Sequence, residues 1–141
     1  MLHGTLAVRA LLRCNMESAR ESAKMRILVA FEDEYRAYRG VIAAAIRVLR
    51  PRAEVVVVGL YALGDEVARF DPHLVICSQP NTVDPGGKPA WVELLVDPTR
   101  PTRACVGGRY SELRNPMLDE LLSIIDDVER LVGTEREPSG C

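Results

Sequence analysis

The chain has 141 residues, of which 48% are hydrophobic and 27% charged, and its formal net charge at pH 7 is -2. This length fits one domain, and the apolar fraction is high enough for a hydrophobic core, which excludes wholesale disorder. The near-neutral charge argues against a large basic surface for nucleic acid. No apolar run reaches the roughly 18 residues of a membrane span. We therefore expect a globular domain that binds neither nucleic acid nor membranes.

The two ends differ in pattern from the middle of the chain. Residues 1–24 carry a short apolar stretch that Arg9 and Arg13 interrupt, and a strong strand pattern begins directly after Met25. We predict that 1–24 is a disordered or helical extension, or the product of an upstream translation start. The polar segment 133–141 is predicted to be a flexible tail. The working domain is then 25–132.

Strand and helix patterns alternate in the first half of this domain. Continuous apolar runs at 26–31, 54–58 and 73–77 predict strands that are buried on both faces. Helical spacing predicts a helix that ends near residue 50, before a proline, and a second helix at 62–70. Arginines at positions 36, 39, 47 and 50 are expected on the solvated face of the first helix. Two consecutive strand-helix-strand units indicate a parallel sheet.

The regular alternation weakens after residue 80. A loop is expected at 81–89, followed by strands at 91–96 and 103–106. Since the gap between these strands is too short for a crossover helix, they form either an antiparallel pair or a parallel pair with a very short connection. Gly107 and Gly108 predict a turn that requires positive φ. Asn115 and Pro116 are typical of a helix start, and an apolar stripe continues to residue 132.

Cysteine and histidine usage restricts the chemistry. The four cysteines, at positions 14, 77, 105 and 141, have no C-x-x-C spacing, and their pattern suits a reducing cytoplasm. Cys77 and Cys105 lie in apolar runs and are expected to be buried thiols. With only His3 and His73 present, a multi-histidine metal site is not available. His73, at the start of a strand, is expected to be structural.

Three segments resemble a response-regulator receiver domain. The strand RILVAF leads into the acidic cluster Glu32-Asp33-Glu34, as receivers open with a strand and an acidic pair. Residues 63–80, LGDEVARFDPHLVICSQP, are similar to the second helix and third strand of a receiver, and NPMLDELLSIIDDVERL resembles its last helix. The resemblance implies an α/β fold with an open, three-layer, mostly parallel sheet of flavodoxin-like type. Its third and fourth helices are expected to be shortened or missing.

Departures from the receiver pattern affect its phosphoryl chemistry. Ser78 stands where the resemblance implies the phospho-acceptor aspartate, and a serine hydroxyl cannot form an acyl phosphate. Asp97 and its following proline replace the expected hydroxyl residue. Gly107-Gly108 replaces the lysine-proline pair and leaves Arg109 as the nearest cation. The resemblance thus implies a degenerate pseudo-receiver without catalytic residues.

Ligands of open parallel sheets bind outside the carboxyl ends of the strands, where the strand order reverses. This rule predicts a crevice, with contributions from Glu32, Asp33, Glu34, Ser78, Gln79, Asn81, Asp97 and Arg109. No cofactor is expected, and if a metal ion binds, Glu32 and Asp33 are the candidates for binding Mg²⁺. The alternative interpretation is that these carboxylates are first-turn charges that favour the helix dipole.

Two functions are compatible with these observations. The first is a cytoplasmic signal-transduction module that contacts a protein partner, or a second copy in a homodimer, without aspartyl phosphorylation. Apolar surface around Trp91, Leu94 and Leu95 is expected to serve this contact, because a covering helix is missing. The second is a protein or enzyme that binds a nucleotide or phosphate in the crevice, which rests on fold analogy.

Overall fold

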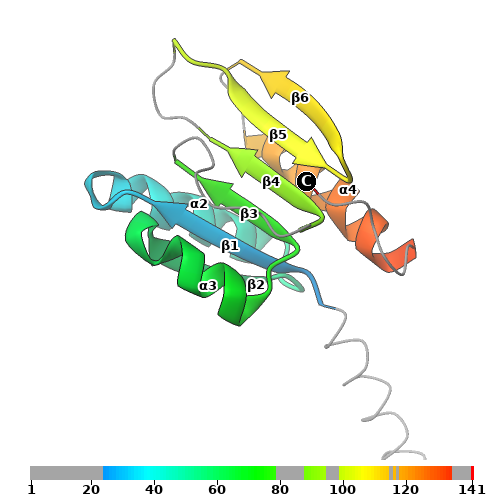
Figure 1. Cartoon of the computed structure of the whole chain (residues 1–141), viewed down its shortest axis with the longest axis horizontal. Helices are drawn as coiled ribbons and strands as arrows, with labels where there is room; N and C mark the ends of the chain where they lie inside the picture. The colour runs from blue at the N-terminus through cyan, green and yellow to red at the C-terminus, as the bar shows by residue number, and fades with distance from the viewer. Residues whose placement is uncertain (1–23, 79–87, 95–98, 115, 117, 135–140) are drawn as a thin grey trace, which may run out of the picture.

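The computed structural model of the chain describes residues 24–78, 88–94, 99–114, 116, 118–134 and 141 (Figure 1). Its strands are β1 (Arg26–Phe31), β2 (Glu54–Gly59), β3 (Leu74–Cys77), β4 (Ala90–Glu93), β5 (Thr102–Val106) and β6 (Arg109–Leu113). Its helices are α2 (Arg36–Leu49), α3 (Leu63–Phe70) and α4 (Leu118–Thr134), with 3₁₀ turns η1 (Asp33–Tyr35) and η2 (Leu60–Ala62). The predicted α/β class is confirmed, and the predicted elements match to within a few residues except that β6 was not predicted.

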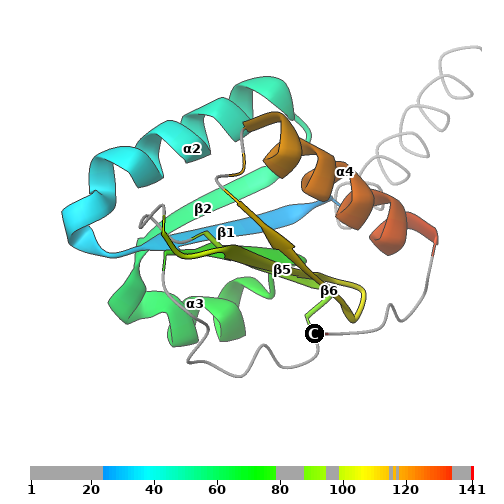
Figure 2. The same ribbon diagram turned by 90° about the horizontal axis from the view of Figure 1, so that it is seen from above.

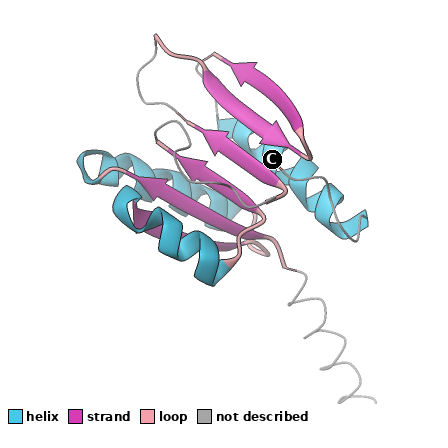
Figure 3. Cartoon of the chain, in the orientation of Figure 1, coloured by secondary structure: helices cyan, strands magenta, loops and turns pink. Residues whose placement is uncertain are grey.

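The strands form one sheet in the order β2-β1-β3-β4-β5-β6 (Figure 3). Strands β2, β1, β3 and β4 are parallel, whereas β4–β5 and β5–β6 are antiparallel pairs. The sheet is therefore mixed, with a parallel half and an antiparallel half. This resolves the alternative that the sequence left open for the fourth and fifth strands.

The antiparallel half ends in a hairpin that the sequence patterns did not indicate. Gly107 and Gly108 have φ angles of 57° and 82°, and Val106 pairs directly with Arg109 across this two-residue turn. Positive φ at both central residues is the requirement of a type I′ hairpin turn. The predicted positive-φ turn is thus confirmed. Strand β6 is exposed along most of its length, so it lacks the apolar alternation that reveals a strand.

Two separate cores lie on opposite faces of the sheet. Helices α2 and α4 cover one face, and α3 covers the other beneath the parallel strands (Figure 2). The first core joins inward side chains of α2 and α4, such as Ile46 and Ile125, to alternate residues of β1, β3, β4 and β5. The second joins Leu63 and Val67 of α3 to Ala30, Cys77 and Trp91. This alternation of faces is the period of two that strands impose.

The expected apolar docking surface is not present in the described residues. Trp91 is 4% exposed and Leu94 is 6% exposed, while Leu95 lies outside the described residues. Trp91 packs with the residues of α3, and Leu94 packs in the core beneath α2 and α4. The prediction that these side chains form an exposed patch was therefore wrong for Trp91 and Leu94.

The predicted domain limits need one correction at the C-terminal side. Helix α4 continues to Thr134, beyond the predicted end at 132.

Cys141 is not part of a flexible end, because it forms a disulfide with Cys105 of β5. Cys77 keeps a buried thiol as predicted, but the expectation of a thiol at Cys105 was wrong. Disulfides are rare in a reducing cytosol, so the cytoplasmic location stays a prediction. Of the extension predicted at 1–24, residues 1–23 lie outside the described residues.

A bidentate ion pair joins α2 to α4. Arg50, which follows α2, donates from Nε and Nη2 to the two carboxylate oxygens of Asp126, at 2.7 and 2.8 Å. Replacing Asp126 by Asn is expected to lower the free energy of unfolding by about 1 kcal/mol, because the pair is partly exposed to water. Asp127→Asn is the matched control, since Asp127 pairs with Arg130 within the same helix. Urea denaturation would measure both, and equal losses would contradict a specific role for the α2–α4 pair.

Candidate functional site

The predicted crevice is built around the ends of β1 and β3. The Glu32 backbone N–H donates to Ser78 Oγ at 3.1 Å, and the Ser78 N–H donates to the Ala30 carbonyl at 3.2 Å. Ser78 is only 5% exposed. Its side chain therefore supplies an acceptor to the backbone where the β1–β3 ladder ends, which leaves it little access to a ligand.

The acidic cluster beside Ser78 does not converge on it. An Asp33 carboxylate oxygen lies 3.7 Å from Arg39 Nη1. The same guanidinium donates to the carbonyls of Phe31 and Val58, at 2.9 and 3.1 Å, and so links the ends of β1 and β2. Asp33 is thereby directed toward the β2 side of the edge. The expectation that the arginines of this helix form a solvated face was wrong for Arg39, which is partly buried.

The two glutamates of the cluster interact with each other. The hydrogen bond that the protonated Glu34 donates to the Glu32 carboxylate, together with the negative charge of Glu32, raises the pKa of Glu34. Such a shift is the behaviour of two neighbouring carboxyl groups that compete for a proton. Across the described ranges, no group of three or more His, Cys, Asp or Glu side chains is placed to hold a metal ion. Since Mg²⁺ keeps several waters and is usually held by one or two carboxylates, its binding by Glu32 and Asp33 stays a prediction.

Arg109 and the two glycines lie at the opposite end of the sheet from the crevice. Because β5 runs antiparallel to β4, its last residue, Val106, pairs with Ala90, the first residue of β4. The turn that follows β5 and the first residue of β6 are therefore at the amino ends of the parallel strands. The prediction that Arg109 flanks the crevice was wrong for this reason. Gln79, Asn81 and Asp97 lie outside the described residues.

Two hollows of the described surface lie against the antiparallel half. One, of about 140 Å³, is lined by Trp91, Glu93, Arg103, Ala104, Cys105, Tyr110 and Cys141. The other, of about 710 Å³, lies between the β5–β6 hairpin and α4, with Val106, Arg109, Ile124 and Leu131 among its lining residues. Neither is lined by the acidic cluster or by Ser78. Sequence reasoning missed both because they depend on the reversal of β5 and on the presence of β6.

His73 has a structural contact at the amino end of the sheet. Its Nδ1 accepts a hydrogen bond of 2.9 Å from the Arg26 backbone N–H, which requires an unprotonated nitrogen. Burial lowers the pKa of His73 from 6.5 to about 4, and the positive charge of Arg26 adds to the effect. The imidazole is thus neutral at pH 7 and fixes the start of β1 against β3.

This histidine makes stability depend on pH. Since the folded pKa is depressed, its contribution is complete above pH 6.5 and is lost as the pH falls from 6.5 toward about 4. The loss is expected to be at most about 2 kcal/mol, because the ring keeps some contact with water. His73→Asn retains a hydrogen-bond acceptor but does not titrate. Urea denaturation of the wild type and of this variant between pH 7 and pH 5 therefore isolates the contribution of His73 protonation to the free energy of unfolding. Parallel curves for the two proteins would contradict the assignment.

Comparison with known proteins supplies no relative. No protein-family model, curated protein or solved structure matches the chain. Within the part of the chain that the structure describes, no helix is both long and apolar enough to cross a membrane. Inferences about function therefore rest on the residues and their arrangement.

Proposed function

We propose that the chain is a non-catalytic, receiver-like interaction module that acts in signal transduction by protein–protein contact, without aspartyl phosphorylation. The proposal rests on the burial and the hydrogen bonding of Ser78. The residue at the acceptor position is buried, bears no carboxylate, and has its oxygen occupied by the Glu32 backbone N–H. Phosphoryl transfer to this position would have to break that hydrogen bond and open the strand ends.

The order of the parallel strands supports the receiver-like part of the proposal. The sequence β2-β1-β3-β4 is that of the first four strands of flavodoxin-like folds. The chain departs from that plan at β5, which is reversed, and at β6, which is added at the sheet edge. A receiver-like module that keeps the acidic cluster after β1 but lacks the phospho-acceptor aspartate and the lysine after the fifth strand would lose phosphoryl transfer. It would still keep a surface for protein contacts.

Strand β6 is the surface that we expect to make the contact. It lies at one end of the strand order, so one side of its backbone has no neighbouring strand in the described sheet. Such an edge is a template for pairing with another strand. Tyr110 is the exposed aromatic residue of β6, with 78% of its surface accessible. The other residues of β6 are polar or charged, except for Leu113. We propose a second copy of the chain as the partner, with β6 pairing to β6 across a two-fold axis.

Acetyl phosphate tests the absence of phosphotransfer. The full chain would be incubated with acetyl phosphate and Mg²⁺, and its intact mass and sedimentation coefficient would be recorded. We expect no phosphoryl adduct and an unchanged oligomeric state. An adduct on Ser78 or on a neighbouring aspartate would overturn the proposal.

Sedimentation velocity tests the contact at β6. We expect a dimer whose fraction rises with concentration, and Tyr110→Lys is expected to shift it to monomer because an edge charge opposes strand pairing. Tyr61→Lys is the matched control, since Tyr61 is 87% exposed in η2, outside the sheet edge formed by β6. A monomer at every concentration, or equal effects of the two variants, would contradict pairing through β6.

The alternative function, binding of a nucleotide or phosphate, is supported by one observation. The chain passes from β1 to β2 and returns to β3 on the other side of β1, which creates the switch point where such ligands bind. A thermal-shift screen with nucleotides, inorganic phosphate and Mg²⁺ would test it. Stabilisation that Asp33→Asn abolishes would favour this function over a contact module.

A further inference from the structure

The disulfide lies on the face of the sheet opposite α4. Cys105 pairs in register with Trp91 on one side and with Tyr110 on the other, so these three side chains form a row across β4, β5 and β6. Trp91 belongs to the core beneath α3, which places the row on the α3 side. No described helix covers β5 and β6 on that side (Figure 2). Cys141 therefore reaches the face that the helices leave uncovered.

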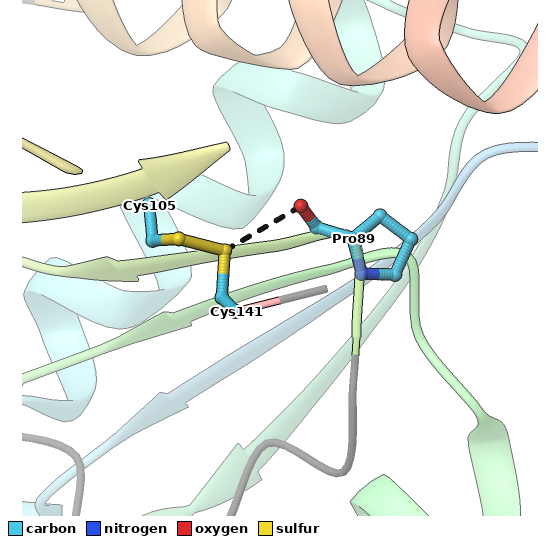
Figure 4. Close-up of a disulfide and its surroundings, with 3 residues drawn as sticks. All are labelled: Pro89, Cys105 and Cys141. Carbon is cyan, nitrogen blue, oxygen red and sulfur yellow. Dashed lines mark hydrogen bonds between the residues drawn. A yellow bond between two sulfur atoms is a disulfide. The ribbon is translucent and has the colours of Figure 1, made fainter. Parts of the chain in front are cut away.

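Besides the disulfide, Cys141 contacts the two described residues that precede β4. Its backbone N–H donates to the Lys88 carbonyl at 2.9 Å. Its Sγ lies 3.6 Å from the Pro89 carbonyl oxygen (Figure 4). The sulfur donates no hydrogen bond there, because a disulfide sulfur carries no proton. The covalent bond to Cys105 is thus the principal attachment of this residue to the sheet.

The two residues of the disulfide differ in their exposure to solvent. Cys105 is 4% exposed, whereas Cys141 is partly exposed, and both line the open hollow of about 140 Å³. We therefore expect an incoming thiolate to approach from the side of Cys141. Access to a disulfide sulfur is one of the factors that determine exchange rates.

From this geometry we infer that Cys105–Cys141 is a reversible thiol–disulfide exchange site for low-molecular-weight thiols, and that its reduction widens the hollow that Cys141 lines together with Trp91. A thiolate attacks Cys141 Sγ and forms a mixed disulfide, while the S–S electron pair leaves on Cys105, which then takes a proton. A second thiolate attacks the external sulfur of the mixed disulfide and releases Cys141. Two external thiols are oxidised to one disulfide, and the protein disulfide is reduced to two thiols.

Cys77 is protected from this exchange. Its thiol lies on the same face, where the Trp91 Nε1–H donates to its sulfur at 3.0 Å, and it is 1% exposed. Trp91 lies in β4, which is between β3 and β5, and so separates the Cys77 thiol from the disulfide. Exchange should therefore modify Cys105 and Cys141 but leave Cys77 unmodified while the protein remains folded.

Kinetics of reduction provide the test, with the full chain carrying Cys14→Ser so that the remaining cysteine outside the described residues does not react. Reduced glutathione would be added at several urea concentrations below the unfolding transition, followed by alkylation and peptide mass mapping. We expect a rate proportional to the thiol concentration and independent of urea, with alkylation at Cys105 and Cys141 only. A rate that rises with urea, with alkylation of Cys77 as well, would show that reduction requires global unfolding and would overturn the inference.

Trp91 reports the structural consequence, because it is the only tryptophan of the chain. We expect acrylamide to quench its fluorescence more strongly after reduction and the original quenching to return with oxidised glutathione. Cys141→Ser should show the reduced-state quenching from the start and no response to glutathione. Reduction at both cysteines without any change in Trp91 quenching would overturn the inferred widening of the hollow. None of these measurements depends on self-association, so the result is separable from the proposed contact at β6.

Discussion

Cys141→Ser is expected to lower the free energy of unfolding by about 3–4 kcal/mol relative to the oxidised protein. The disulfide joins residues that are 36 positions apart, and closing a loop of that length removes conformational entropy from the unfolded chain. A loss of this size corresponds to a fall in Tm of about 10–20 °C for a domain of this length. Urea and thermal denaturation of the two proteins would measure it.

Two controls isolate the covalent bond from the side chain. Wild-type protein in excess dithiothreitol should have the stability of Cys141→Ser, and Cys14→Ser should retain the stability of the oxidised wild type. A difference of less than about 1 kcal/mol between oxidised protein and Cys141→Ser would contradict the account, because side-chain changes at partly exposed positions alone are of that order.

Ser78→Asp is expected to destabilise the fold by about 3 kcal/mol or more at pH 7, although it restores the residue type that a phospho-acceptor requires. The new carboxylate would be buried and would lie against the backbone of Glu32, which is itself acidic. Burial would raise its folded pKa, so the loss should be complete above that pKa and should diminish as the pH falls toward about 4. Urea denaturation at pH 7 and pH 5 would measure this.

Ser123→Asp is the matched control for the buried serine. Ser123 is exposed on α4, so the same chemical change should alter the free energy of unfolding by no more than about 0.5 kcal/mol. Ser78→Ala is expected to cost about 1–3 kcal/mol, because the Glu32 N–H would lose its acceptor. If Ser78→Asp were as stable as the wild type, the position would be open to solvent and the structural role of Ser78 would be wrong.

The parallel half of the fold could be predicted from the sequence because its signals are local. Continuous apolar runs identified β1, β2 and β3, and helical spacing with proline or glycine boundaries identified α2, α3 and α4. The direction of β5 could not be predicted, since the short connection after β4 is compatible with either direction. Strand β6 was missed because an exposed edge strand need not have an apolar face.

The candidate site was predicted only where it depends on the first and third strands. Glu32 and Ser78 do meet at the ends of β1 and β3, as the fold rule requires. Arg109 was misplaced because its position depends on the direction of β5. Arg39 was overlooked because, by its spacing alone, an arginine that binds strand-end carbonyls cannot be distinguished from one on a solvated face. The disulfide depends on contacts between distant segments, which single-sequence patterns do not contain.

Backbone amide chemical shifts test the central claim most directly, namely that the carboxyl edge of β1 and β3 is a structural contact and does not serve as a phosphoryl or ligand site. The full chain would be titrated with Mg²⁺, then with beryllofluoride, inorganic phosphate and nucleotides. We predict no saturable shift at Glu32, Asp33, Glu34 or Ser78. Saturable shifts confined to these four residues would contradict the claim and establish the edge as a binding site.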